Sequence, residues 1–163
     1  MHRVAIELND AVFEDYIRFV FKSPHGDIKV KQSLPLGKYI SSQVKFAKQP
    51  RLSYGKANTA LIISFPSLNH LTSNPYFDQL ATTQINKAIS FYLDADFREF
   101  CILGYEKKMK LQAIVAKFIE VYNISGGDDA FERFKKREYR RRKKIDEMFM
   151  ERIRLFELSE IDI

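Results

Sequence analysis

The spacing of apolar residues changes along the chain and predicts two kinds of structure. Up to about residue 82 the apolar residues come in short runs separated by turn residues, and beyond it they recur every three or four residues. Arg3–Leu8 has the pattern of a short strand, and Ala11–Phe21 has the spacing of a helix that starts at Asn9-Asp10. Thr59–Phe65 is β-branched, almost continuously apolar and followed by Pro66, which predicts the central strand of a small sheet.

Weaker patterns predict the other elements of the amino-terminal half. Ile28–Lys31 alternates as an edge strand does, and Pro35 is expected to begin a short helix that continues through Phe46. Residues 48–58 are expected to form a polar loop, and Tyr76–Ala81 a second edge strand. These elements together predict a small mixed β-sheet with short helices.

From Gln84 onward the pattern predicts only helices. The first runs to about Met109 and is capped by Thr82 or Thr83, the second covers Leu111–Tyr122, and the third runs from about Asp128 to Leu158.

We therefore expect an α+β fold with two regions. Residues 1–82 form the small α+β domain, and residues 83–163 form a helical, helix-turn-helix-like region that ends in a long basic helix. The turn before that helix contains Gly126-Gly127, and Ser125 with Asp128 has the spacing of a capping box.

Composition narrows the class of protein. With 163 residues, 45% hydrophobic, the chain is too apolar to be intrinsically disordered. A single cysteine excludes a disulfide framework and a cysteine-rich zinc site. The first residues lack the pattern of a signal peptide, and polar residues interrupt every apolar run before bilayer length. We expect a cytoplasmic protein with no membrane partner.

The positive charge is concentrated in one segment. The net charge is +6, but residues 131–145 contain nine Lys and Arg against two acidic residues, a local net of +7. The other 148 residues sum to −1. A local concentration of this kind favours a polyanionic partner.

Residues 111–144 fit a helix, a short turn and a second, basic helix, as in helix-turn-helix DNA-binding proteins. Phe131 and Phe134 are expected to pack against Phe118 and Tyr122 and leave the basic residues exposed. We predict a nucleic-acid-binding regulator or accessory factor, with double-stranded DNA favoured. The predicted contact residues are the Lys and Arg side chains of the segment: Arg133, Lys135, Lys136, Arg137, Arg140, Arg141, Lys143 and Lys144.

Other interpretations of the basic segment remain open. It is also typical of a solvated helix face, and the acidic segment 146–163, with a net charge of −4, is a candidate to pair with it within one chain or between two. A membrane-surface helix fits the dense arginines and the acidic flank less well. The alternative function is a non-enzymatic assembly or inhibitor protein that uses this basic and acidic helix for protein contacts.

The helical apolar stripe continues after the basic segment. We expect its residues to pack on the chain's own domain or on a second copy, which makes a homo-oligomer through the carboxy-terminal helix. Two heptads without regular leucines are too few for a leucine zipper. The stripe consists of Ile145, Met148, Phe149, Ile153, Leu155 and Phe156.

Catalytic motifs are lacking in the sequence. The histidines are scattered, no phosphate-binding glycine loop follows a strand, and Cys101 falls on the apolar face of a helix, as an inert buried thiol does. The pairs Asp94/Asp96 and Asp128/Asp129 are the candidate metal ligands of a nuclease, but surface acids and helix-start acids are the simpler interpretation. We predict no enzyme, no cofactor and no metal.

Three segments in the last third of the chain resemble small uncharacterised proteins of phages and mobile elements of the Bacteroidetes. They are Gly104-Tyr105, Leu111–Ile124 and the end of the basic helix, Tyr139-Arg140-Arg141-Arg142. A looser likeness covers Ile6–Phe21. The resemblance implies a phage or mobile-element setting, is compatible with DNA binding, and brings no catalytic residues.

Overall fold

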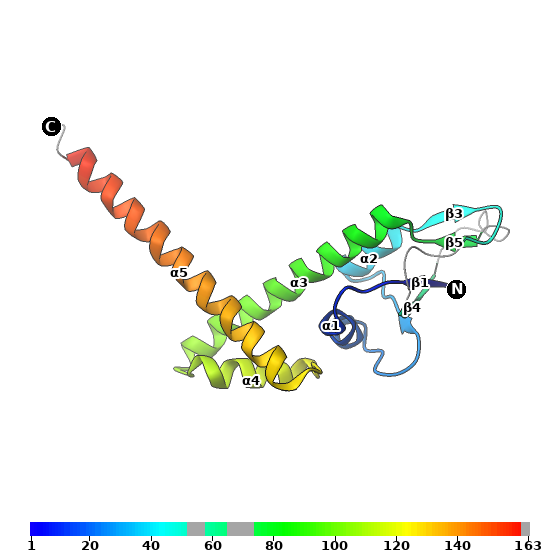
Figure 1. The fold of residues 1–163 in the computed structure, drawn as a ribbon, viewed down its shortest axis with the longest axis horizontal. Coiled ribbons are helices and arrows are strands. Elements are labelled where there is room, and N and C mark those ends of the chain that lie inside the picture. The colour runs from blue at the N-terminus through cyan, green and yellow to red at the C-terminus, as the bar shows by residue number, and fades with distance from the viewer. Residues whose placement is uncertain (52–57, 65–73, 161–163) are drawn as a thin grey trace.

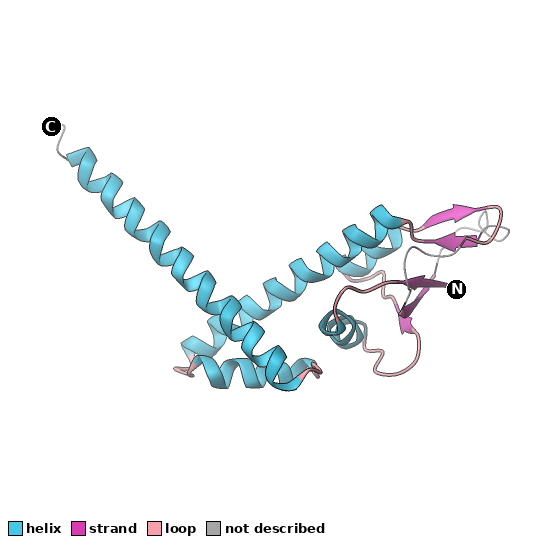
Figure 2. Ribbon diagram, viewed as in Figure 1, coloured by secondary structure: helices cyan, strands magenta, loops and turns pink. Residues whose placement is uncertain are grey.

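A computed structural model describes residues 1–51, 58–64 and 74–160. The strands gather at one end of the molecule, and the helices extend from them to the other end (Figures 1 and 2). The fold is α+β, with small sheets in the amino-terminal half and a helical carboxy-terminal half, as predicted.

The main sheet has three strands in the order β1-β4-β2. β1 (His2–Ile6) pairs antiparallel with β4 (Thr59–Ile63), and the short β2 (Ile28–Lys29) pairs parallel with β4 on its other side. Leu61 and Ile63 of β4 are fully buried. The predictions of a central strand at 59–65 and an edge strand near 28 are confirmed, and Phe65 lies outside the described residues.

A second pair of strands was not expected. α2 (Pro35–Ser42) ends before Phe46, and β3 (Lys45–Ala47) pairs antiparallel with β5 (Asn74–Tyr76). The predicted helix through Phe46 and the predicted strand at 76–81 are therefore wrong. Each of these two predictions rests only on neighbouring residues, whereas the β3–β5 pairing joins segments almost thirty residues apart.

Side-chain caps set the starts of two helices. Asp10 accepts a hydrogen bond from the Val12 amide (3.0 Å) and begins α1 (Ala11–Phe21), as predicted. Asp78 accepts one from the Ala81 amide (2.8 Å) and begins α3 (Gln79–Glu106). The predicted caps at Thr82 and Thr83 are wrong, because both residues lie inside α3.

Three helices form the rest of the body. α3, α4 (Leu111–Tyr122) and α5 (Gly127–Glu160) enclose the rings of Phe97, Phe118 and Phe134, whose centroids are 4.8 to 5.1 Å apart. The predicted packing of Phe134 on Phe118 is confirmed, and Phe131 is partly buried against the same core. One apolar cluster runs from the sheet to this trio of rings, and residue 82, the predicted domain boundary, lies within α3.

The turn from α4 to α5 is held by α1. Asn123 ends α4 with a left-handed backbone (φ 50°), which asparagine tolerates better than most residues. The Ser125 amide and hydroxyl both donate to Asp15 of α1, at 2.7 and 2.6 Å. The predicted capping box is wrong because α5 begins at Gly127, so that Gly126 and not Ser125 is the residue before the helix.

Candidate nucleic-acid interface

The first turns of α5 are embedded in the body through one face. Ala130, Phe134 and Glu138 follow each other at four-residue intervals and are all buried. This spacing places them in one line along the helix. The opposite face of the same turns is directed to solvent.

A buried carboxylate lies at the end of this embedded face. Glu138 is 1% exposed and accepts hydrogen bonds from Arg141 Nε and Nη2, both 2.7 Å, and from the Tyr105 hydroxyl at 3.2 Å. Arg142 is 3.4 Å from the same carboxylate and lies over the Tyr105 ring, 4.0 Å from its centroid. A buried charge is tolerated only with partners of this kind, so Arg141 and Arg142 serve the packing of α5.

The Glu138 cluster shifts the pKa of its neighbours. The hydrogen bond that Arg141 donates to Glu138 raises the pKa of the Arg141 guanidinium above its ordinary value, so this side chain is a permanent cation. Burial and the Glu138 charge raise the pKa of the Tyr105 hydroxyl to about 12. At neutral pH the Arg141 guanidinium is therefore charged and the Tyr105 hydroxyl is neutral.

Two further arginines of the segment reach back to other helices. Arg133 hydrogen-bonds Asp10, the cap of α1, and Arg137 hydrogen-bonds Asp94 of α3. Both pairs connect positions far apart in the sequence. They fix the direction in which α5 leaves the body.

Two lysines form weaker pairs on the helix surface. Lys135 lies 3.2 Å from Glu132, and Lys143 lies 3.9 Å from Glu147. Exposed pairs one turn apart contribute about 0.3–0.5 kcal/mol and are screened by salt. Phosphates readily displace such partners, so both lysines remain accessible to an anion.

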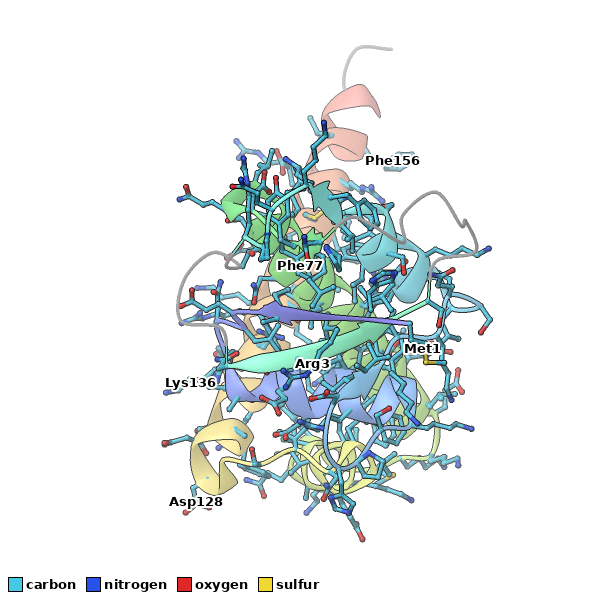
Figure 3. The ribbon with its side chains drawn as sticks, turned by 90° about the vertical axis from the view of Figure 1, so that its right-hand side faces the viewer. Met1, Arg3, Phe77, Asp128, Lys136 and Phe156 are labelled. Carbon is cyan, nitrogen blue, oxygen red and sulfur yellow. The ribbon has the colours of Figure 1, made fainter. Side chains whose placement is uncertain are left out.

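Lys136, Arg140 and Lys144 form a separate line at four-residue intervals, which we call the basic row. All three are exposed, and within the part of the chain that the structure describes none of them forms an ion pair. Lys136 points outward at the edge of the molecule (Figure 3). These three cations are the part of the basic segment that is directed to solvent and unneutralised.

The structure thus divides the eight predicted contact residues. Arg133 and Arg137 are paired with Asp10 and Asp94 of the body, unlike the three cations of the basic row. Arg141 is held by Glu138. The pairs of Glu138 with Arg141 and Arg142 could have been predicted from the sequence, because Glu138 lies three and four residues before them. The pairs with Asp10 and Asp94 could not, because these residues are too distant in sequence to be recognised as partners.

Sequence reasoning missed a hollow of about 360 Å³ between α3 and α5. Its lining includes Phe91, which is 69% exposed, and Arg98. It also includes Arg137 and Arg141 together with their ion-pair partners, Asp94 and Glu138. An exposed aromatic ring beside arginines is the combination on which proteins stack unpaired bases and hold their phosphates.

The other candidate residues have structural partners. Cys101 is fully buried, and burial together with the Glu138 charge raises the pKa of its thiol to about 12. Asp96 accepts hydrogen bonds from Tyr16 (2.7 Å) and Tyr122 (3.4 Å). Among the described residues no group of three or more His, Cys, Asp or Glu is placed to hold a metal ion. Asp128 and Asp129 lie in the first turn of α5, where acidic residues favour the helix.

The carboxy-terminal part of α5 projects away from the body (Figure 1). Its apolar side chains are exposed, so the prediction that they pack on the chain's own domain is wrong. None of the helices in the described residues has the length and apolar character needed to cross a bilayer.

Comparisons of the chain with protein-family models, with curated proteins and with solved structures gave no match.

Proposed function

We propose that the protein binds nucleic acid, double-stranded DNA in the first place, through the basic row of α5. The observation that carries the proposal is the line of three exposed and unpaired cations in the basic segment 131–145, whose other arginines are paired with carboxylates. Four residues of helix rise about 6 Å, so the row extends about 12 Å along the axis. A major groove about 12 Å wide admits such a helix.

The body supports this use of α5 in two ways. The pairs Arg133–Asp10 and Arg137–Asp94 fix the start of the helix, so the row is presented on a rigid element. Helix α4 and the turn at 123–126 precede α5 in the order of a helix-turn-helix unit. A regulator or accessory factor, in the phage or mobile-element setting that the sequence resemblance implies, is the corresponding role.

The test is a salt titration of duplex binding, followed by fluorescence anisotropy of a labelled duplex. Because each phosphate contact releases counterions, replacing the row by Ala (K136A/R140A/K144A) should reduce the slope of log K against log salt by about 2 to 3. The matched control K29A/K31A/K38A removes three exposed charges from the amino-terminal half. An equal loss of slope in both variants, or no binding by the wild type, would overturn the proposal.

A second candidate function is a non-enzymatic assembly or inhibitor protein. The observation that favours it is the exposed apolar surface on the projecting part of α5. Exposed apolar side chains gathered on one element mark a site of protein contact.

A further inference from the structure

The projecting part of α5 carries an exposed apolar surface, which we call the apolar tail. Its side chains are between 37% and 64% exposed. In water a helix without tertiary packing is only marginally stable, because most helical stability in proteins comes from burying an apolar face. The tail lies far out from the body, as the position of Phe156 in Figure 3 illustrates. It consists of Ile145, Met148, Phe149, Met150, Ile153, Leu155 and Phe156.

One face of the apolar tail has the shape that receives a helix. Ile145, Met148, Phe149 and Arg152 line a hollow of about 140 Å³. They occupy positions i, i+3, i+4 and i+7, the four residues that form the hole for a side chain of a partner helix in coiled-coil packing. The shape therefore favours a helix as the occupant.

Charge identifies the helix and its direction. Residues 131–145 have a net charge of +7, and residues 146–163 have a net charge of −4. Two copies of α5 side by side in opposite directions place the acidic segment of each next to the basic segment of the other. Two parallel copies place like charges together, which costs free energy.

We propose that the apolar tail pairs with the same tail of a second copy of this chain, antiparallel, with the dyad near Phe149. The proposal deepens the second candidate function by naming the partner and its direction. Arg140 is nine residues, or about two and a half turns, from Phe149 and so lies on the opposite side of α5. Lys144 is one turn before Met148 and therefore borders the paired surface.

The first experiment measures the oligomeric state without nucleic acid, by sedimentation velocity over a range of concentrations. The wild type should dimerise, and F149D should shift the dissociation midpoint at least tenfold toward monomer. The control L80D places the same charge at an exposed leucine of α3 and should leave the dimer intact. A monomeric wild type, or a dimer that F149D does not weaken, overturns the proposal.

The second experiment determines the direction of pairing from spin labels on K143C and R154C, both at exposed positions. In an antiparallel pair a label at either position alone gives a long separation, since six residues on each side of the dyad for K143C and five for R154C add about 18 and 15 Å along the axis. Mixing the two labelled proteins gives a short separation between the K143C label of one copy and the R154C label of the other. Short separations for each label alone indicate a parallel pair and overturn the proposal. The proposal is also overturned if a helix of another protein displaces one copy of the chain from the pair. Because pairing is measured without nucleic acid and is tested at Phe149, failure of nucleic-acid binding and failure of pairing are distinguishable.

Discussion

The carboxylate of Asp10 holds two helices at once, because it caps α1 and receives the guanidinium of Arg133 from α5. It accepts the Val12 amide at 3.0 Å, and Arg133 donates to both of its oxygens. Residues 10 and 133 are more than a hundred positions apart, so this contact fixes the start of α5 against the amino-terminal half of the chain.

The Asp10–Arg133 pair should make stability depend on pH. Burial alone raises the pKa of the Asp10 carboxyl, but the hydrogen bonds from Arg133 and the Val12 amide outweigh it, and the pKa is lowered. Its contribution is therefore present above the unfolded pKa and is lost as pH falls through the folded one. We expect urea denaturation to show that D10N, which keeps an acceptor for the cap, loses about 1 kcal/mol at pH 7 and less at pH 2.

The double mutant D10N/R133A provides the control for this prediction. If the pair is the cause, R133A should show the same weakened pH dependence, and the double mutant should add little to it. A pH profile of R133A that matches the wild type would show that Arg133 is not the partner that matters.

Glu138 should be the acidic residue of α5 with the greatest effect on stability. Replacing it with Ala leaves Arg141 and the Tyr105 hydroxyl without their shared acceptor in a buried setting. We expect a loss of roughly 2–3 kcal/mol, below the full cost of a deeply buried pair because Arg141 is partly exposed. The control E132A breaks only the surface pair with Lys135 and should cost under about 0.5 kcal/mol. Similar losses for the two variants would contradict this assignment.

Gly104 should be required for the close approach of α3 and α4. A Cβ at this position would lie 2.5 Å from Ile114 Cγ1, so G104A should cost roughly 1–3 kcal/mol in thermal or urea unfolding. In an I114A background the added methyl has room, and G104A should then cost much less. Additive losses in the double mutant would mean that the contact is not the cause.

Local signals made the boundaries of two helices predictable, whereas features that depend on distant contacts could not be predicted. The bounds of α1 and α4 follow from Asp10 and Asn123, which act on the adjacent backbone. The β3–β5 pairing and the Arg137–Asp94 pair depend on segments that meet only in the folded chain. The sequence located the charge of the candidate site, but only the fold shows which cations point outward.

Cys101 should be unreactive while the protein is folded. Its thiol is buried with a pKa of about 12, which lowers the thiolate fraction at pH 8 by about a thousandfold against an ordinary cysteine. A thiol-reactive dye should label the native chain at least that much more slowly than the chain in denaturant. Rapid labelling under native conditions would show that the packing of α3 against α5 opens frequently.

The division of the basic segment can be tested by two variants that remove the same charge from the same helix. K136Q/R140Q alters the basic row, and R133Q/R137Q alters the two arginines that face the body. We expect the first variant to lower duplex affinity and to reduce the salt slope by about 2 while unfolding as the wild type does. The second should unfold at lower denaturant and keep its slope, because its arginines already neutralise Asp10 and Asp94. The opposite result would mean that Arg133 and Arg137 leave their carboxylates to bind phosphate, and that docking of α5 competes with nucleic-acid binding.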